Sequence, residues 1–285
     1  MFRPFRQWPA FFRAIPSSRV PARHLRSARL RARPQCSVLE LLEQRDVPAV
    51  INLTVSSLAD TGAGTLRSAI TTADAGDPTD SYVINITAPG TITLESALPD
   101  LSGDITITGL GTGVGGSTVR RDPGQATPFR VFTVDPGATV SLTGLTITGG
   151  NAGGGLGGGV DDSGTLTVSR CVLMGNTAGF GGGLDVEASG TASVIGSTFT
   201  ANSAGTNGGG LNNSNSATVS GSTFTRNTAA SLGGGLANGG PAGVFNSTFT
   251  GNSAGSNGGG IYTRDTATVS GGAFTSNSAA FGGGL

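Results

Sequence analysis

Apolar residues recur at a fixed interval in the second half of the chain, separated by Gly, Ser, Thr and Asn. One segment occurs four times between residues 191 and 285, and its copies read STFTANSAGTNGGGL, STFTRNTAASLGGGL, STFTGNSAGSNGGGI and GAFTSNSAAFGGGL. The aligned columns are Phe199, Phe224, Phe249 and Phe274; Val194, Val219, Val244 and Val269; Asn202, Asn227, Asn252 and Asn277; and Leu211, Leu236, Ile261 and Leu285. This period of about 25 residues predicts a solenoid of stacked coils.

The residue types in each repeat favour strands over helices. Short runs of Val, Thr and Phe alternate with Gly or Asn corners, and no run of good helix formers is present. We therefore predict a parallel β-helix with about three short strands per coil, in which like residues stack about 4.8 Å apart. The Phe rings would stack inside, and the Asn amides would pass hydrogen bonds from coil to coil. A disordered Gly/Ser linker is the alternative, but it gives no reason for four columns in phase.

The repeat resembles a known family. FTxN followed by GGGL or GGGI is similar to the repeat of polymorphic outer membrane proteins, which pairs FxxN with GG-A-[LI]; here Gly stands in place of the Ala. The resemblance covers about residues 140–285. It implies a right-handed, single-stranded parallel β-helix that is exposed at the cell surface and is often adhesive. An autotransporter barrel follows the repeats in that family, and because this sequence ends before any barrel, that export route is not supported here.

Three regions are expected. Residues 1–49 form an Arg-rich leader and a LELLEQR segment, largely disordered; residues 50–139 form an N-terminal cap and the first, irregular coils; residues 140–285 form the regular coils. In the second region, TLRSAITTADA predicts a short amphipathic capping helix that covers the open end of the first coil. Its apolar residues at helical spacing are Leu66, Ala69, Ile70 and Ala73. The surrounding SSLADTGAGTLRSAI also resembles the segment that opens bacterial β-helix exoproteins.

Charge is unevenly distributed. Residues 1–35 contain nine Arg and no acidic residue, whereas residues 36–285 contain eight Arg and seventeen Asp and Glu. Such an arm could bind nucleic acid, bind an anionic membrane or direct targeting. We favour an export-related leader and no nucleic-acid partner, because the remaining surface is acidic and would repel phosphate. No standard secretory signal and no apolar run of membrane-spanning length is visible.

The LELLEQR segment, residues 39–45, follows this leader. It resembles the LE-x-LE-x-R segment that follows an Arg-rich leader in many large bacterial exoproteins. The alternative interpretation is that this segment forms a single helical turn, which ends at a linker containing Pro48.

Several kinds of chemistry are excluded from the folded region. The chain has no Lys, and its one His, His24, lies in the leader. A His-assisted nucleophile, a His metal cluster and a Lys-bearing phosphate loop are therefore not expected. GTGVGG at residues 111–116 matches GxGxxG, but no helix is expected to follow it, so nucleotide binding is not predicted. Cys171 falls in the column of Ser197 and its equivalents, which predicts a small buried side chain and no disulfide with Cys36.

Acidic residues occupy one column in two successive coils. Stacking would place Asp161 over Asp185 about 4.8 Å away, with Asp162 and Glu187 close by. Carboxylates this close raise a pKa or recruit a cation, and calcium is the cation that suits these four ligands. Carboxylates about 5 Å apart also suit a retaining glycosidase, and a lyase would need a basic neighbour, for which Arg170 is the candidate. The simplest alternative is that these residues are solvated turns that diverge into water.

We therefore predict a secreted, cell-surface or outer-membrane protein with a structural or adhesive, non-enzymatic role. Its partner would be a surface polysaccharide or another cell-surface protein. The alternative is a carbohydrate-active enzyme that uses Asp161 and Asp185, and a third reading is the N-terminal portion of a longer exoprotein. The chain ends part-way through a coil, with Phe274 and Phe281 near the open edge. We therefore expect that the chain is part of a longer protein or that it associates end to end.

Overall fold

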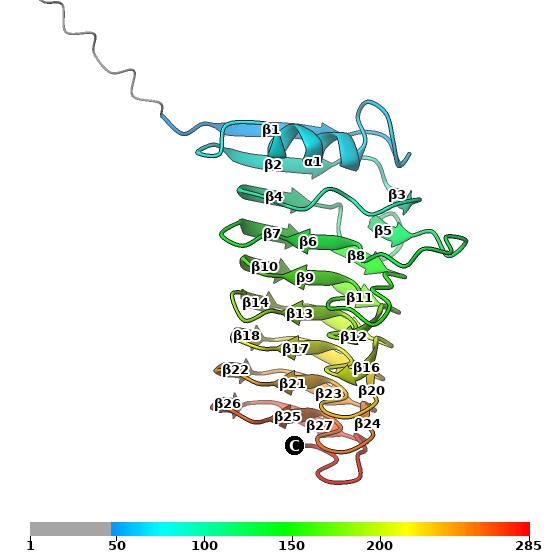
Figure 1. Ribbon diagram of the computed structural model, residues 1–285, viewed down its shortest axis with the longest axis vertical. Coiled ribbons are helices and arrows are strands. Elements are labelled where there is room, and N and C mark those ends of the chain that lie inside the picture. Colours follow the sequence, from blue (N-terminus) through cyan, green and yellow to red (C-terminus); the bar gives the residue numbers. More distant parts are fainter. Residues whose placement is uncertain (1–46) are drawn as a thin grey trace, which may run out of the picture. The chain divides into compact units, whose positions relative to one another are not determined.

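A computed structural model describes residues 47–285, which belong to one compact unit. The chain in this range winds into a parallel β-solenoid of about eight turns with very little helix (Figure 1). The predicted fold class of a parallel β-helix is confirmed. The leader and the LELLEQR segment lie outside the described residues.

Four parallel sheets form the walls of the solenoid. The first sheet contains β1 (Val50–Val55), β2 (Ser81–Ile86), β4 (Asp104–Thr108), β7 (Thr139–Thr143), β10 (Thr165–Ser169), β14 (Thr191–Ile195), β18 (Ser216–Ser220), β22 (Ala242–Phe245) and β26 (Ala267–Ser270). The second contains β3 (Gly90–Leu94), β5 (Ser117–Arg121), β8 (Leu145–Thr148), β11 (Val172–Met174), β15 (Thr198–Thr200), β19 (Thr223–Thr225), β23 (Thr248–Thr250) and β27 (Ala273–Thr275). In both sheets, strands from before the predicted boundary at residues 139 and 140 pair with strands from after it. The predicted cap and the regular coils therefore share the same walls.

The other two sheets are shorter. The third sheet contains β6 (Phe132–Val134), β9 (Val160–Asp162), β13 (Leu184–Val186), β17 (Leu211–Asn213), β21 (Leu236–Asn238) and β25 (Ile261–Thr263). The fourth contains β12 (Thr177–Phe180), β16 (Ser203–Asn207), β20 (Thr228–Ala229) and β24 (Ser253–Ala254). The middle coils therefore have four strands, and the prediction of three is wrong there. The Ser-Ala or Thr-Ala pair after each ladder Asn, which resembles a loop in composition, stays extended and buries its Ala.

The predicted Phe column forms a stack inside the solenoid. Ring centroids of Phe199, Phe224, Phe249 and Phe274 lie 4.6, 4.7 and 5.1 Å apart in turn, and each pair is nearly parallel. The first three rings are fully buried. Strand pairing places each Phe opposite the next, so the 25-residue period and the stack have the same cause. Burial of such rings is the largest apolar contribution per coil.

The predicted Asn column forms a hydrogen-bonded ladder. Each Nδ2 donates to the next Oδ1, at 3.0 Å from Asn176 to Asn202, 3.0 Å from Asn202 to Asn227 and 2.9 Å from Asn227 to Asn252. Each Oδ1 also accepts the backbone N–H of the Asn one coil earlier, and each Nδ2 also donates to a carbonyl one coil earlier, such as that of Phe199 for Asn227. Every polar atom of these buried amides is therefore used, which is the condition for burying them without a net cost.

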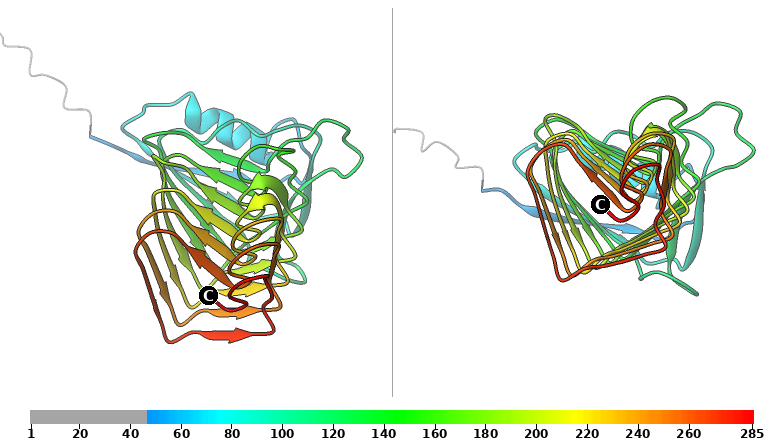
Figure 2. Two further views of the ribbon diagram at one scale, coloured as in Figure 1. Left: turned by 60° about the horizontal axis from the view of Figure 1, so that its bottom comes forward. Right: turned by 90° about the horizontal axis from the view of Figure 1, so that it is seen from below.

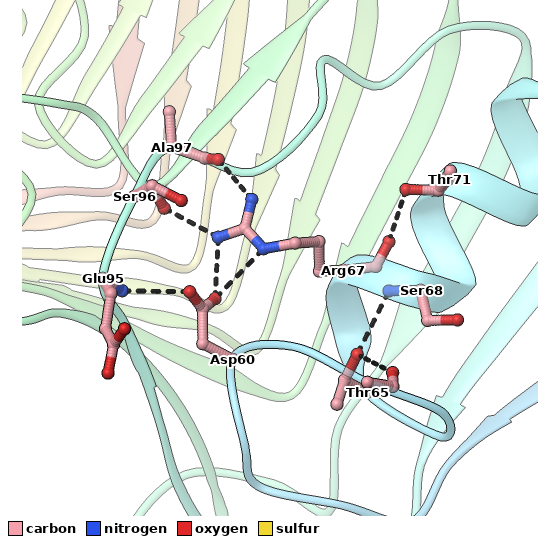
Figure 3. Close-up of polar contacts among 9 residues, drawn as sticks. Asp60, Thr65, Arg67, Ser68, Thr71, Glu95, Ser96 and Ala97 are labelled. Carbon is pink, nitrogen blue, oxygen red and sulfur yellow. Dashed lines mark hydrogen bonds and ion pairs between the residues drawn. The ribbon is translucent and has the colours of Figure 1, made fainter.

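The predicted capping helix is α1 (Leu66–Asp74). Its buried residues are the four that the sequence pattern selects, Leu66, Ala69, Ile70 and Ala73. Thr65 caps the N-terminus by accepting the N–H of Ser68 at 3.2 Å. Figure 3 shows how Arg67 joins this helix to its surroundings, since its guanidinium donates to Asp60 at 2.7 Å and to the carbonyl of Ser96 at 2.9 Å.

Two further sequence expectations concern single motifs. Cys171 is buried and free, its backbone N–H donates to Ser197 Oγ at 3.1 Å, and it therefore occupies the predicted Ser column. Cys36 lies outside the described residues. The Gly111–Gly116 loop leads into strand β5. Phe281 and Leu285 are exposed in the last coil, and end-to-end association remains a prediction. In residues 47–285 no helix has the length and apolarity that a membrane span requires.

The ladder generates a first prediction. Replacing Asn227 by Ala removes the acceptor of both the backbone N–H and the side-chain amide of Asn202. Because those buried donors would lose their partner, the free energy of unfolding should fall by ~1–3 kcal/mol, measured by chemical denaturation. Thr225→Ala, on the outer surface of the same coil, is the control. A change for Asn227→Ala within about 0.5 kcal/mol, as for ordinary surface substitutions, would rule out a stabilising ladder.

The glycine corners generate a second prediction. A Cβ on Gly235 would lie 2.5 Å from the carbonyl oxygen of Gly260 and 2.7 Å from the Phe249 ring. Gly235→Ala should therefore push neighbouring coils apart and cost ~1–3 kcal/mol in denaturation. Gly154→Ala is the matched control, because a Cβ there meets nothing within 4 Å. Equal stability of the two variants would contradict the close approach.

Candidate functional site

The outward face of the third sheet carries a column of varied side chains. Strand pairing aligns Asp161 with Asp185, Asp185 with Asn212, Asn212 with Ala237, and Ala237 with Tyr262. The predicted placement of Asp161 against Asp185 is confirmed. This column differs from the Phe and Asn columns because it changes at almost every coil.

Asp162 lies on the other face of strand β9. Successive strand residues point to opposite faces, and Asp162 shares its register with Val186, Asn213 and Asn238. Its Oδ1 accepts the N–H of Gly164 at 3.1 Å. Glu187 follows strand β13, is half-buried, and contributes its backbone N–H to the carbonyl of Asp162.

The three aspartates are buried, so the interpretation as solvated turns is wrong for them. Asp161, Asp162 and Asp185 are 3%, 0% and 1% exposed; together they are called the acidic row below. The glycine corners explain this burial. Gly157 and Gly181 pass so close that a Cβ on them would lie 2.6 and 2.7 Å from the Cα atoms of Asp161 and Asp185.

Two polar side chains bind the acidic row from either side. Arg130, which is half-buried, forms an ion pair with Asp161 through Oδ2. Asn212 donates through Nδ2 to Asp185 Oδ1 at 2.8 Å. The basic neighbour expected from the sequence, Arg170, is exposed and lines a different hollow with Thr108 and Thr143. That expectation is wrong, because Arg130 comes from an irregular coil in which the repeat gives no alignment.

Burial dominates the electrostatics of the acidic row. It raises the pKa of Asp161 to about 6, against the lowering effect of Arg130. It raises the pKa of Asp162 to about 7, where the Gly164 N–H opposes it and the neighbouring carboxylates add to it. It also raises the pKa of Asp185 to about 7, against the hydrogen bond from Asn212. Asp161 Oδ1 and Asp162 Oδ2 are buried without hydrogen-bond partners. Near neutral pH, Asp162 and Asp185 are therefore partly protonated, whereas Asp161, which is paired with Arg130, is largely ionised.

A calcium ion takes about six to eight oxygen ligands. One oxygen of Asp161 is held by Arg130 and one of Asp185 by Asn212. Within residues 47–285, no group of three or more His, Cys, Asp or Glu side chains is arranged to hold a metal ion. Calcium binding by Asp161, Asp162, Asp185 and Glu187 stays a sequence-based prediction.

A groove lies beside the acidic row. Seen along the solenoid axis, the coils stack over one another and their outline is indented on one side (Figure 2). The groove has a volume of about 200 Å³ and is lined by Phe180, Asn207, Asn212, Asn213, Ser214, Leu232, Ala237, Asn238, Gly239, Tyr262 and Arg264. These residues come from four successive coils. Amides, a hydroxyl, two aromatic rings and one guanidinium thus face a common space.

This groove was not predicted from the sequence. The signal was present, because Asn212, Asn238 and Tyr262 lie at or beside the same column as the acidic pair. What the sequence did not reveal is that the wall folds inward there, so that residues one position apart in the repeat line one hollow.

Comparisons with known proteins identify no family for this chain. No family model and no curated sequence matches the chain. The solved structure described as pectate lyase Pel9A is 13% identical, with a TM-score of 0.46, and the alignment covers 79% of this chain and 78% of that one. Geobacillus virus E2 ORF18 is 12% identical, with a TM-score of 0.38, and 81% and 59% are covered. Neither similarity indicates which residues of this chain act.

The acidic row generates a prediction about pH. The pKa of each carboxyl is raised above the ordinary value of about 4 that applies in the unfolded chain, so the folded state holds protons that the unfolded state releases. This stabilisation is fully present below about pH 4 and is lost as the pH rises through 6 and 7. The free energy of unfolding should fall by at least about 2 kcal/mol from pH 4 to pH 7.5, since each pKa unit corresponds to about 1.4 kcal/mol.

Denaturation curves across this range test the prediction. Asp162→Asn should flatten the pH dependence, and the fold accepts Asn at this column because Asn213 and Asn238 already occupy it. Glu95→Gln, an exposed carboxyl in another coil, should leave the native slope intact. A stability that rises between pH 4 and 7.5 would show that the row is ionised and solvated.

Proposed function

We propose that this solenoid is a binding protein of the cell surface that holds an extended polysaccharide in its groove. The observation that carries the proposal is the lining of the groove by side chains from four successive coils. Because coils repeat about every 4.8 Å, the groove offers a new set of contacts at each step, which suits a polymer better than a small compact ligand.

The chemistry of the lining supports a sugar ligand. The half-buried rings of Phe180 and Tyr262 can cover the apolar faces of sugars. The amides of Asn212 and Asn238 and the hydroxyl of Ser214 can exchange hydrogen bonds with sugar hydroxyls. A few convergent polar groups between apolar surfaces are the usual composition of a ligand site. An extracellular location and a structural or adhesive role follow from such a partner. Another cell-surface protein is the other occupant that the binding assay would reveal.

A carbohydrate-active enzyme is the second candidate. The carboxyls Asp161 and Asp185 have pKa values of about 6 and 7, which suit a general acid near neutral pH. Their burial weighs against this role, since at 3% and 1% exposure a substrate cannot reach them without movement of the glycine corners. We therefore favour binding without catalysis.

Tyr262→Ala tests the proposal. The same column already holds Ala237, so the variant should fold. The variant should bind a panel of neutral and acidic polysaccharides roughly tenfold more weakly than the native chain does, which corresponds to about 1.4 kcal/mol of binding free energy. The same assay should also measure released products. Thr218→Ala, exposed on the first sheet, should bind like the native chain. If Tyr262→Ala binds as tightly as the native chain, the groove is not the binding site. Release of products would favour the second candidate, a carbohydrate-active enzyme.

A further inference from the structure

One residue belongs both to the groove and to the surroundings of the acidic row. Asn212 lines the groove, and its Nδ2 donates to Asp185 Oδ1 at 2.8 Å and to Ser214 Oγ at 3.4 Å. Both N–H donors of this amide are therefore engaged. The carbonyl Oδ1 is the hydrogen-bonding atom that remains, and within residues 47–285 no hydrogen bond from the protein reaches it.

A second carbonyl lies in the same wall. Asn207 lines the groove, and its Oδ1 is buried and has no hydrogen-bond partner. A buried carbonyl without a donor costs free energy, and a donor supplied by a ligand removes that cost. Asn207 and Asn212 thus present acceptors to whatever occupies this part of the groove.

Acidic groups outnumber basic ones near these two carbonyls. Asp185 contacts Asn212 directly, and it is in register with Asp161, which has Arg130 as its partner. Glu187 adds a further carboxylate beside the row. The positive group of the groove, Arg264, follows strand β25, two coils away from Asn212. An anionic ligand group next to Asn207 and Asn212 would meet carbonyl oxygens and carboxylates, with the neutral hydroxyl of Ser214 as a donor and Arg264 two coils away.

We infer that the groove selects neutral polysaccharides, whose hydroxyl groups donate to the carbonyls of Asn207 and Asn212, and that Asp185 is the residue that positions Asn212. Asp185 fixes the orientation of the amide by accepting from Nδ2, and this leaves the acceptor side for the ligand. Sugars that carry a carboxylate in place of a hydroxymethyl group lose one donor per sugar, and at a pH where the acidic row is ionised they are repelled by its charge. The inference rests on the proposed polysaccharide binding and adds the class of polymer.

A matched pair of ligands tests this selectivity. β-1,4-linked oligomannose and oligomannuronate of equal length differ at one position of each sugar, where a hydroxymethyl group is replaced by a carboxylate. At pH 8, where the acidic row is charged, the native chain should bind oligomannose at least about tenfold more tightly by titration calorimetry. Asn212→Ala should reduce oligomannose binding, and Thr218→Ala should leave it unchanged.

Two variants of Asp185 separate positioning from a merely structural role. Asp185→Ala leaves the Asn212 amide free to rotate, so oligomannose binding should weaken about fivefold and the preference over oligomannuronate should shrink. Asp185→Asn keeps an acceptor for Asn212 Nδ2 and removes the charge, so oligomannose binding should be retained while oligomannuronate binding improves. Both residues already occur in this column, as Ala237 and Asn212, so both variants should fold.

The outcomes distinguish the two proposals. If neither oligosaccharide nor any polymer of the panel binds, both the proposed function and this inference fail. If oligomannuronate binds as tightly as oligomannose, the polysaccharide function stands and the selectivity is wrong. If Asp185→Ala and Asp185→Asn behave alike, with the native preference unchanged, Asp185 does not position Asn212.

Discussion

The hydrogen bond between one buried Asn amide and the next is the interaction on which the rest of the solenoid depends. It forms at 3.0 Å or less from coil to coil because strands pair in parallel without a shift between Asn202, Asn227 and Asn252. A displacement by one residue would point each amide at the opposite face of the wall. The same register sets the Phe rings 4.6 and 4.7 Å apart. Polar and apolar columns therefore enforce one alignment.

Stacking of like residues has the opposite consequence for acidic side chains. An amide has both a donor and an acceptor, so Asn227 can satisfy its neighbours on both sides, whereas an ionised carboxylate has acceptors alone. Asp161 and Asp185, paired by the same register, cannot complete a ladder unless protons are added. Arg130 and Asn212 supply donors at the two ends of this pair, and burial raises the pKa values of the carboxyls until protons supply the rest. The pH dependence of stability follows from the fold itself.

Much of the interior could be predicted from the sequence because interior positions repeat. Phe199, Asn202 and Cys171 were placed by their columns, and Leu66 and its helical neighbours were placed by their spacing. Features that depend on departures from the repeat could not be predicted. Arg130 comes from a coil without a clear alignment, and the fourth sheet is built largely from small residues whose composition resembles a loop. The burial of Asp185 depends on the close approach of the Gly181 backbone, and the alignment of repeats does not show that approach.

The lining of the groove depends on a difference between two kinds of column: those that keep one residue type and one that varies. The Phe and Asn columns keep one residue type through successive coils, because each member must fit the coil above and the coil below. The outward column of the third sheet has no such partner requirement, and it changes from Asp185 to Asn212, Ala237 and Tyr262. Since the wall folds inward beside that column, each change alters the lining of the groove without disturbing the core. A repeat that is rigid inside and varied along one outer column can thus offer each segment of a polymer a different contact, and the positioning of Asn212 by Asp185 is one case in which neighbouring coils set that contact together.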